Sequence, residues 1–303
     1  MELLSGAVVR TLPLMPRPLV WRVARRYVAG PRLDDAIATA RRLRGEGAMT
    51  TVDVLGEAVD SRQRVTTFVD QYVRTLEALA AGGLDVNVSI KPTMFGLLLD
   101  ESFCQDNLER VVVTAKAHGG FVRIDMEDRS TTDATLRMYR NLHARHGSVG
   151  VVLQAYMRRT LRDIEELPTE GANVRLCKGI YIEPRAAAWK GYETVRANFT
   201  AALEKLLARG VYVGIATHDE YLTCRAVELV DRLRVPRERY ELQMLLGVED
   251  ELRRILVAEG HPLRVYVPYG EDWYLYSLRR LRENPAIAGH VLRGFLGLQP
   301  RRA

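Results

Sequence analysis

Two patterns of hydrophobic and polar positions alternate along the chain from residue 48 onward. The first is a short run rich in Val, Ile, Leu and Tyr, which is typical of a parallel strand buried on both faces. The second places apolar residues three and four positions apart, as on one face of a helix, and is clearest between Val65 and Ala80. The first pattern predicts eight strands, over Thr50–Leu55, Asp85–Ile90, Phe121–Met126, Val149–Tyr156, Asn173–Cys177, Val211–Thr217, Tyr240–Leu245 and Leu263–Pro268.

Helical patterns separate these strands, near Asp106–Ala117, Asp133–Arg145, Thr194–Ala208, Tyr221–Leu233 and Glu249–Ala258. The strands recur at roughly 30-residue intervals, the size of one βαβ unit. Eight such units over about 250 residues match a (β/α)8 barrel. A doubly wound sheet is the alternative, but it normally carries a glycine-rich phosphate-binding turn, and the sequence has neither GxGxxG nor GxxxxGK[ST]. We therefore predict an α/β fold, a (β/α)8 TIM-like barrel over residues 48–303.

The residues before the barrel, 1–47, are predicted to form an arm of short helices. Within it, Arg17–Tyr27 interleaves four arginines with apolar residues at helical spacing, which predicts a basic amphipathic helix. Such a helix either packs on the main domain with solvated arginines or lies on an anionic membrane surface. The residues themselves leave both interpretations open.

Composition and charge narrow the class of protein. A hydrophobic content of 47% and a charged content of 27% are those of an ordinary globular protein. No window approaches the ~18 apolar residues of a membrane span, and the interrupted N-terminus does not resemble a signal peptide. Three cysteines without paired spacing imply no disulfide framework, so we expect a cytoplasmic location. The net charge of +6 favours an acidic ligand or surface.

The carboxyl ends of the predicted strands, where barrel enzymes carry their chemistry, are unusually polar. A single charged residue at a strand end is more often a solvated rim charge. Groups from seven strands meeting in one mouth, however, need a ligand or mutual pairing to offset their desolvation. Cations outnumber acids, which favours a ligand with carboxylates or phosphates. The residues are Lys91, Asp125, Glu127, Gln154, Arg175, Lys178, Thr217, His218, Asp219, Gln243, Tyr266 and Tyr269, followed by Arg279, Arg280 and Glu283 on one helical face.

Other functions remain open on the residues alone. Lys91 or Lys178 at a strand end is compatible with a Schiff-base lyase. The basic surface is compatible with a non-enzymatic lipid-binding or nucleic-acid-binding protein. The arginines are not interleaved with stacking aromatics, so nucleic acid is the least favoured partner. No HExxH motif or paired CxxC is present, and we predict no metal site.

The strand ends also closely resemble the signature segments of the proline dehydrogenase family. The matching blocks fall in family order on every strand but the first, over residues 48–297, in a chain whose length resembles the monofunctional bacterial form. They are Val88-Ser89-Ile90-Lys91-Pro92, Arg123-Ile124-Asp125-Met126-Glu127, Gln154-Ala155-Tyr156, Val174-Arg175-Leu176-Cys177-Lys178-Gly179-Ile180-Tyr181, Ala216-Thr217-His218, Glu241-Leu242-Gln243-Met244-Leu245, Arg264-Val265-Tyr266-Val267-Pro268-Tyr269-Gly270 and Leu278-Arg279-Arg280-Leu281-Arg282-Glu283-Asn284.

This resemblance implies a distorted barrel that binds FAD non-covalently, oxidises L-proline to Δ1-pyrroline-5-carboxylate and passes electrons to a membrane quinone. It also implies peripheral contact with the inner membrane and is compatible with a homo-oligomer. Lys91, Tyr266, Arg279, Arg280 and Glu283 would bind the substrate, Asp125 would complete a network with Lys91 and Tyr266, and Arg175 would lie beside the flavin N5. The residues implied to line the cofactor are Met126, Gln154, Arg175, Lys178, Gly179, Ile180, Tyr181, Thr217, His218 and Gln243.

Three positions depart from the pattern that the resemblance leads us to expect. Asp219 stands where many relatives have asparagine and adds a negative charge near the implied phosphates. Cys177 and Ile180 replace commoner small or branched residues, and Cys177 is interpreted as a packed small hydrophobe. None of these changes removes a functional side chain, so we expect an active enzyme.

Overall fold

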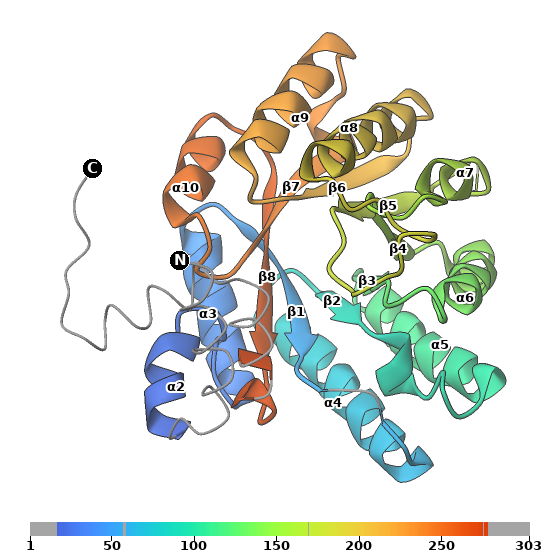
Figure 1. Ribbon diagram of the computed structural model, residues 1–303. Coiled ribbons are helices and arrows are strands. Elements are labelled where there is room, and N and C mark those ends of the chain that lie inside the picture. The colour runs from blue at the N-terminus through green and yellow to red at the C-terminus, as the bar shows by residue number, and fades with distance from the viewer. Residues whose placement is uncertain (1–16, 57–58, 169, 275, 278–303) are drawn as a thin grey trace.

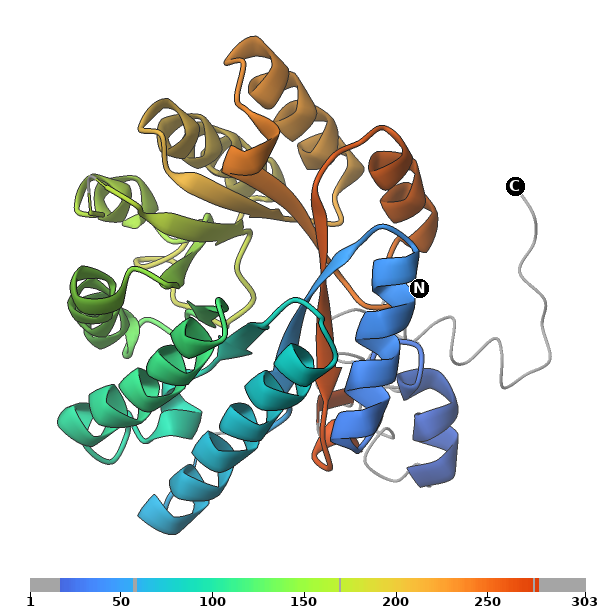
Figure 2. The same ribbon diagram turned by 180° about the vertical axis from the view of Figure 1, so that it is seen from behind.

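The eight strands form a closed parallel barrel in chain order, β1 to β8, with β8 paired to β1. The computed structural model describes residues 17–56, 59–168, 170–274 and 276–277. Helices surround the barrel on its outer side (Figures 1 and 2). The predicted fold class is therefore confirmed. The strands are β1 (Met49–Val54), β2 (Asn87–Ile90), β3 (Phe121–Ile124), β4 (Val149–Gln154), β5 (Asn173–Cys177), β6 (Tyr212–Ala216), β7 (Tyr240–Leu245) and β8 (Leu263–Tyr269).

The helices fill the connections that the apolar periodicity predicts. One connection also carries a helix that was not predicted, α7, because six residues are too few to show a period of 3.6. The helices are α2 (Arg17–Ala24), α3 (Leu33–Gly45), α4 (Arg62–Ala81), α5 (Glu101–Ala117), α6 (Thr132–His146), α7 (Thr160–Glu165), α8 (Tyr192–Ala208), α9 (Glu220–Arg232) and α10 (Asp250–Ala258), with short 3-10 helices η2 (Pro92–Phe95) and η3 (Arg237–Arg239).

Every strand boundary lies within two residues of the prediction, and local hydrogen bonds account for two of the two-residue shifts. The start of β2 moves to Asn87 because the Asp85 carboxylate accepts a hydrogen bond from the Thr50 amide at 3.0 Å. The Asp85 carbonyl then accepts from the Asn87 amide, which makes a turn. At the other end of the barrel, β4 stops at Gln154 because its carbonyl accepts from the Met157 amide.

The segment predicted as a basic amphipathic helix is partly helical, as α2. Its Val20 and Ala24 side chains are buried, and the ring of Trp21 contacts that of Trp273 with centroids 4.7 Å apart. The apolar side of α2 therefore packs on the protein itself, which favours the first of the two interpretations. None of the helices in the described part of the chain combines the length and the hydrophobicity that crossing a membrane requires. The membrane-surface interpretation stays a prediction.

The position of α3 changes how the barrel closes. It packs against β1 and β8 (Figure 1), where a regular repeat would place the helix that follows the eighth strand. The chain after β8 instead crosses to the end of β1, where Tyr276 is buried against Val28 and Leu55. Leu55 directly follows β1, so the chain leaves β8 toward the mouth of the barrel.

Hydrophobic and polar residues divide between the two faces of the strands. One face of each strand packs with the helices in a single hydrophobic cluster, which includes Val52, Ile90 and Tyr72. The other face points into the barrel, because its polar side chains bond across the interior between strands that are not neighbours, as Arg175 of β5 does with Ser89 of β2. The interior of this barrel is therefore polar, and the candidate site lies at the carboxyl-terminal ends of the strands.

Candidate active site

Five side chains at the barrel mouth form a continuous chain of ion pairs and hydrogen bonds, which we name the mouth network. Lys91 Nζ pairs with Asp53 Oδ1 at 2.7 Å and donates to the Tyr266 hydroxyl at 3.4 Å. That hydroxyl donates to Asp125 Oδ2 at 3.2 Å, and Arg175 Nη1 pairs with Asp125 Oδ1 at 2.8 Å. Negative and positive charges thus alternate around the mouth, with the neutral Tyr266 between Lys91 and Asp125. The members are Asp53, Lys91, Tyr266, Asp125 and Arg175.

Arg175 is fixed from several directions. Its Nε donates to Gln243 Oε1 at 2.6 Å, and its Nη1 donates both to Asp125 and to Ser89 Oγ at 2.8 Å. Ser89 in turn donates to Asp125 at 2.8 Å. The guanidinium also lies 5.3 Å from the centre of the Tyr266 ring. A positive charge held this rigidly can stabilise negative charge that develops beside it without first reorganising.

A second polar layer below the mouth holds Gln243 in place. Gln243 donates through Nε2 to Glu241, and Glu241 forms an ion pair with Arg264 at 2.9 Å. Tyr212 donates to the other oxygen of Glu241 at 2.9 Å. Burial alone would raise the pKa of Glu241, but Arg264 and these hydrogen bonds outweigh it and lower that pKa. Glu241 is therefore an ionised acceptor that orients the Gln243 amide toward Arg175.

Burial and charge set the protonation of the mouth network. Burial lowers the pKa of Lys91, but the attraction of Asp53 and Asp125 outweighs it, and the net pKa is raised. Burial, with Asp125 and Asp53 nearby, raises the pKa of Tyr266 well above its usual value. Lys91 is thus an ammonium and Tyr266 a neutral phenol. A charged, paired ammonium is a poor nucleophile, so the geometry disfavours the Schiff-base alternative at Lys91.

A separate set of charges lies at the ends of β5 and β6, and we name it the rim cluster. Asp219 accepts from Arg196 through both oxygens at 2.7 and 2.9 Å, from Lys178 at 3.1 Å and from the Tyr192 hydroxyl at 2.8 Å. The charge that departs from the family pattern is therefore neutralised locally. The members are Lys178, Tyr192, Arg196 and Asp219, and Arg196 also forms an ion pair with the exposed Glu193 at 3.2 Å, so the two cations face two acids.

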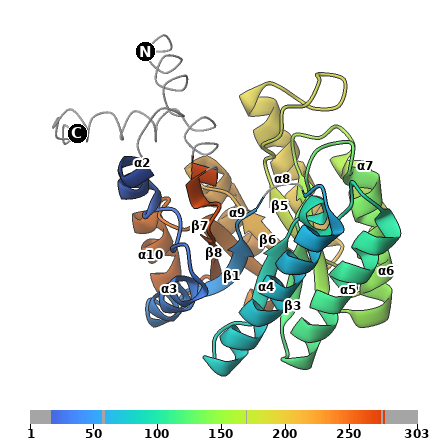
Figure 3. The same cartoon turned by 90° about the horizontal axis from the view of Figure 1, so that it is seen from below.

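The remaining predicted cofactor residues line the same end of the barrel. Gln154 is buried and donates to the main-chain oxygen of Glu127 at 2.8 Å. His218 Nε2 accepts from the Leu245 amide at 2.8 Å, so that nitrogen carries no proton. Met126 and Thr217 are buried, whereas Ile180 is 47% exposed. Tyr181 is partly buried in the segment between β5 and α8, which extends beyond the strand ends (Figure 3).

The backbone conformation and the packing at position 179 both require glycine. Its φ of +105° lies in the region that favours glycine, and a Cβ there would fall 2.2 Å from the Tyr156 ring. The turn after Lys178 therefore packs directly against Tyr156. The predicted substrate residues Arg279, Arg280 and Glu283 lie outside the described residues.

Sequence reasoning missed the partner of Lys91. It assigned Asp125 to that network but did not select Asp53, whose carboxylate forms the ion pair and is completely buried. One Asp53 oxygen, Oδ1, also accepts from Tyr72 at 3.1 Å, and the other has no hydrogen-bond partner among the described residues. The available signal was an acidic residue inside the apolar run of strand one, since carboxylates are almost never fully buried unless paired.

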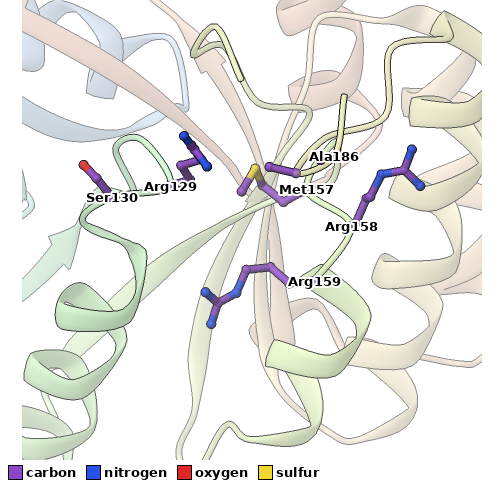
Figure 4. Close-up of a pocket in the computed structure, with 7 residues that line it drawn as sticks. Arg129, Ser130, Met157, Arg158, Arg159 and Ala186 are labelled. Carbon is purple, nitrogen blue, oxygen red and sulfur yellow. The ribbon is translucent and has the colours of Figure 1, made fainter. Parts of the chain in front are cut away.

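A cavity of about 470 Å³ lies outside the mouth network, between the segments that follow β3, β4 and β5. Met157 and Ala186 lie near its centre, and the side chains of Arg129, Arg158 and Arg159 point in different directions (Figure 4). Arg129 pairs with Glu183, and Arg159 pairs with Asp133 and Asp163. Two of its three cations are therefore already neutralised.

Comparison with known proteins indicates the same family as the order of the sequence blocks. The family model for proline dehydrogenase matches residues 36–293. The chain is 37% identical over 287 residues to the proline dehydrogenase of Deinococcus radiodurans, covering 93% of each, and 36% identical over 273 residues to proline dehydrogenase 1 of Bacillus subtilis, covering 90% of each.

Among solved structures, the fold is similar to proline utilization A from Bdellovibrio bacteriovorus inactivated by N-propargylglycine. The TM-score is 0.80 at 26% identity, and the match covers 90% of this chain. This chain spans about a third (33%) of that longer protein. The sequence blocks, the closed barrel and these likenesses together show that the chain belongs to the proline dehydrogenase family.

Proposed function

We propose that the protein oxidises L-proline to Δ1-pyrroline-5-carboxylate by hydride transfer to a non-covalently bound FAD and passes the electrons to a membrane quinone. The observation that carries the proposal is the mouth network, in which Lys91, Tyr266, Asp125 and Arg175 meet in one chain of contacts in a member of this family. The names of the relatives and the order of the sequence blocks support the same reaction.

The residues present fit FAD. Lys178, which directly follows β5, and Arg196 of α8 are partly exposed cationic donors, which suits a pyrophosphate. Gln154 and the fixed guanidinium of Arg175 present donors suited to the polar edge of an isoalloxazine. When bound, FAD supplies the hydride acceptor, and the protein must bind, orient and exclude water.

The chain's own residues have complementary roles toward the substrate. Hydride transfer requires reacting atoms about 3–3.5 Å apart, which depends on how the carboxylate of proline is held. The Lys91 ammonium would bind that carboxylate together with Arg279 and Arg280, which Glu283 would position. The Tyr266 ring would contact the ring of proline, while its hydroxyl remains bonded to Asp125.

Asp125 and Arg175 form the electrostatic centre of the site. Asp125 accepts from Arg175, Ser89 and Tyr266, so its oxygens orient these groups. Arg175 would stabilise the negative charge that gathers when the hydride arrives. We infer that these two residues are the catalytic pair, and that Gln243 and Ser89 orient the Arg175 guanidinium through their hydrogen bonds.

Anaerobic spectroscopy tests the cofactor and the substrate together. The purified protein, reconstituted with FAD, is expected to lose its visible flavin absorbance on addition of L-proline and to keep it with D-proline. Protein that neither contains flavin nor takes it up would contradict the proposal, as would flavin that L-proline leaves oxidised. Arg279→Met or Arg280→Met is expected to raise the KM for proline strongly and to leave flavin bound.

The membrane acceptor needs a separate experiment. Arg22 and Arg25 of the segment at α2 are exposed, whereas its apolar side is packed. The double variant Arg22→Gln/Arg25→Gln is expected to reduce turnover with quinone in anionic vesicles and to leave turnover with a soluble dye unchanged. Equal loss of both activities would assign the segment a packing role only.

A further inference from the structure

A second cavity, of about 390 Å³, lies on the outer side of the barrel among α3, α10 and the chain that follows α2. Its charged lining comes from segments far apart in the sequence that lie side by side in the fold (Figure 1). The charged lining residues are Arg26, Arg42, Glu46, Asp250, Arg253 and Arg254.

Arg253 is the central member of this lining. The residue is 5% exposed, and its Nη2 donates to Glu46 at 2.6 Å. Its Nε and Nη1 are buried and have no hydrogen-bond acceptor within the described part of the chain. The nearest carboxylate to Nε, Asp250, is 3.6 Å away. Buried donors without acceptors are rare in folded proteins because each one forfeits its hydration.

The charges in the lining do not balance. Glu46 is shared, because one oxygen accepts from Arg42 and the other from Arg253, each at 2.6 Å. Burial alone would raise the pKa of Glu46, but these hydrogen bonds outweigh it and lower that pKa, so Glu46 is ionised. Four guanidinium groups thus face two carboxylates among the described lining residues, which leaves two positive charges in excess.

Close packing fixes Arg26 beside this cavity. Gly247 has a φ of +73°, and a Cβ at this position would fall 2.1 Å from the carbonyl oxygen of Arg26. Only glycine permits this approach of two backbones. The Arg26 Nε then donates to the Gly247 carbonyl at 2.9 Å. The Arg26 guanidinium is therefore placed before any ligand arrives, which reduces the entropic cost of binding.

The larger cavity in Figure 4 offers a contrast, because two of its arginines already form ion pairs with carboxylates and the three side chains point in different directions.

We propose that the cavity at Arg253 binds a phosphate group, supplied either by a free phosphate ester or by a lipid headgroup. A guanidinium fork matches the geometry of phosphate oxygens and gives charge-assisted bonds. This site goes beyond the proposed reaction and does not depend on it.

Phosphate binding by the full-length holoenzyme tests the site. Isothermal titration with inorganic phosphate, and thermal unfolding in phosphate against chloride at equal ionic strength, are expected to show binding and a stabilising shift. Arg253→Gln is expected to weaken phosphate binding at least tenfold. Because that residue is buried, Arg42→Gln and Arg254→Gln, both at exposed positions, provide variants that are expected to fold. Arg41→Gln is the matched control, since Arg41 is exposed on α3 but does not line the cavity.

Vesicles separate the two sources of phosphate. If the cavity binds a headgroup, sedimentation with phosphatidylglycerol vesicles falls in Arg42→Gln and Arg254→Gln but not in Arg41→Gln. If it binds a free ester, these variants lose phosphate affinity and sediment as the wild type does. Absence of phosphate binding, or equal affinity in the cavity variants and Arg41→Gln, would overturn the site. Flavin reduction by L-proline, measured in parallel, is expected to be unchanged in all of them.

Discussion

The mouth network and the rim cluster use the same kinds of ion pair but differ in how far their cations are exposed to water. In the mouth network two acids face two cations, and the side chains range from completely buried at Asp53 to 17% exposed at Lys91. In the rim cluster the central acid, Asp219, is also buried, at 3% exposed, but its cations are more open, since Lys178 is 33% and Arg196 20% exposed. The mouth network is thus largely closed to water, whereas in the rim cluster a buried acid is held by cations that water can reach.

This difference predicts opposite responses to substitution. Removing one member of a buried, balanced pair leaves a charge without compensation, which is far more costly than the pair itself is stabilising. Removing the partly exposed Lys178 from the rim leaves Asp219 bonded to Arg196 through both oxygens, and an ion pair that water reaches contributes little. Stability should therefore be sensitive at the mouth and tolerant to loss of Lys178 at the rim, while we expect the proposed FAD binding to depend on the rim.

The largest effect is expected for Lys91→Met. This change leaves the Asp53 carboxylate buried without its cation and should lower the free energy of unfolding by about 3–5 kcal/mol. Guanidinium denaturation of the apoprotein measures the loss. Lys178→Met, the matched change at the rim, should cost less than about 1 kcal/mol. The double variant Asp53→Asn/Lys91→Met should recover part of the loss, and a single variant as stable as the wild type would contradict the comparison.

Arg175→Gln is expected to have the next largest effect, on activity. The change removes the positive charge that Asp125, Ser89 and Gln243 hold in place, and loss of one preorganised donor typically lowers kcat about 10²–10³-fold. Steady-state kinetics with L-proline and a soluble dye measure it. Arg196→Gln at the rim should mainly weaken FAD retention and leave the kcat of FAD-saturated enzyme near that of the wild type. If Arg175→Gln instead weakened FAD retention and Arg196→Gln lowered kcat, the roles assigned to the two regions would be wrong.

The same two regions show how far the sequence alone predicts this molecule. The barrel follows from periodicity, because each strand and most helices are long enough to reveal their spacing. Lys91 and Asp125 directly follow β2 and β3, and their place at one end of the barrel follows from the fold, since parallel strands bring their carboxyl ends to one face.

The pairing of those residues does not follow from their positions. Lys91 pairs with Asp53 because β1 lies beside β2, and an acidic residue within an apolar run gives no sign of its partner. Asp219 is matched by Arg196, which comes from α8 and has no motif of its own. Such contacts depend on side-chain reach between elements, and spacing along the chain does not encode it.

Gly179 lies beside the rim cluster and predicts an intermediate effect. It follows Lys178 of the rim cluster and packs on Tyr156. With φ at +105°, Gly179→Ala combines backbone strain with a collision, so we expect a loss of about 2 kcal/mol. Thermal unfolding measures the change. Gly45→Ala is the control, because a Cβ there meets no atom within 4 Å and alanine stabilises a helix by about 0.5 kcal/mol. Equal stability of the two variants would contradict the packing described.

The last effect concerns Asp219 and depends on pH. Burial opposes its ionisation, but hydrogen bonds from Arg196, Tyr192 and Lys178 outweigh burial and hold the pKa of Asp219 well below its usual value. In the unfolded chain the Asp219 carboxylate is protonated at about pH 4, whereas in the folded protein it stays ionised to a lower pH. The stability that Asp219 contributes is therefore present above about pH 4 and is lost as the pH falls through its folded value.

Asp219→Asn should accordingly lower the free energy of unfolding at neutral pH, but by less than Lys91→Met does, because the freed Lys178 and Arg196 are partly exposed and can turn to water. Urea denaturation across the acid range should show the difference from the wild type shrinking below about pH 4, where the unfolded wild-type chain is also protonated. Tyr192→Phe is the control, since it removes one neutral donor and leaves the carboxylate to titrate. A difference that stays constant with pH would mean that the two cations at the rim are held by packing rather than by the charge of Asp219.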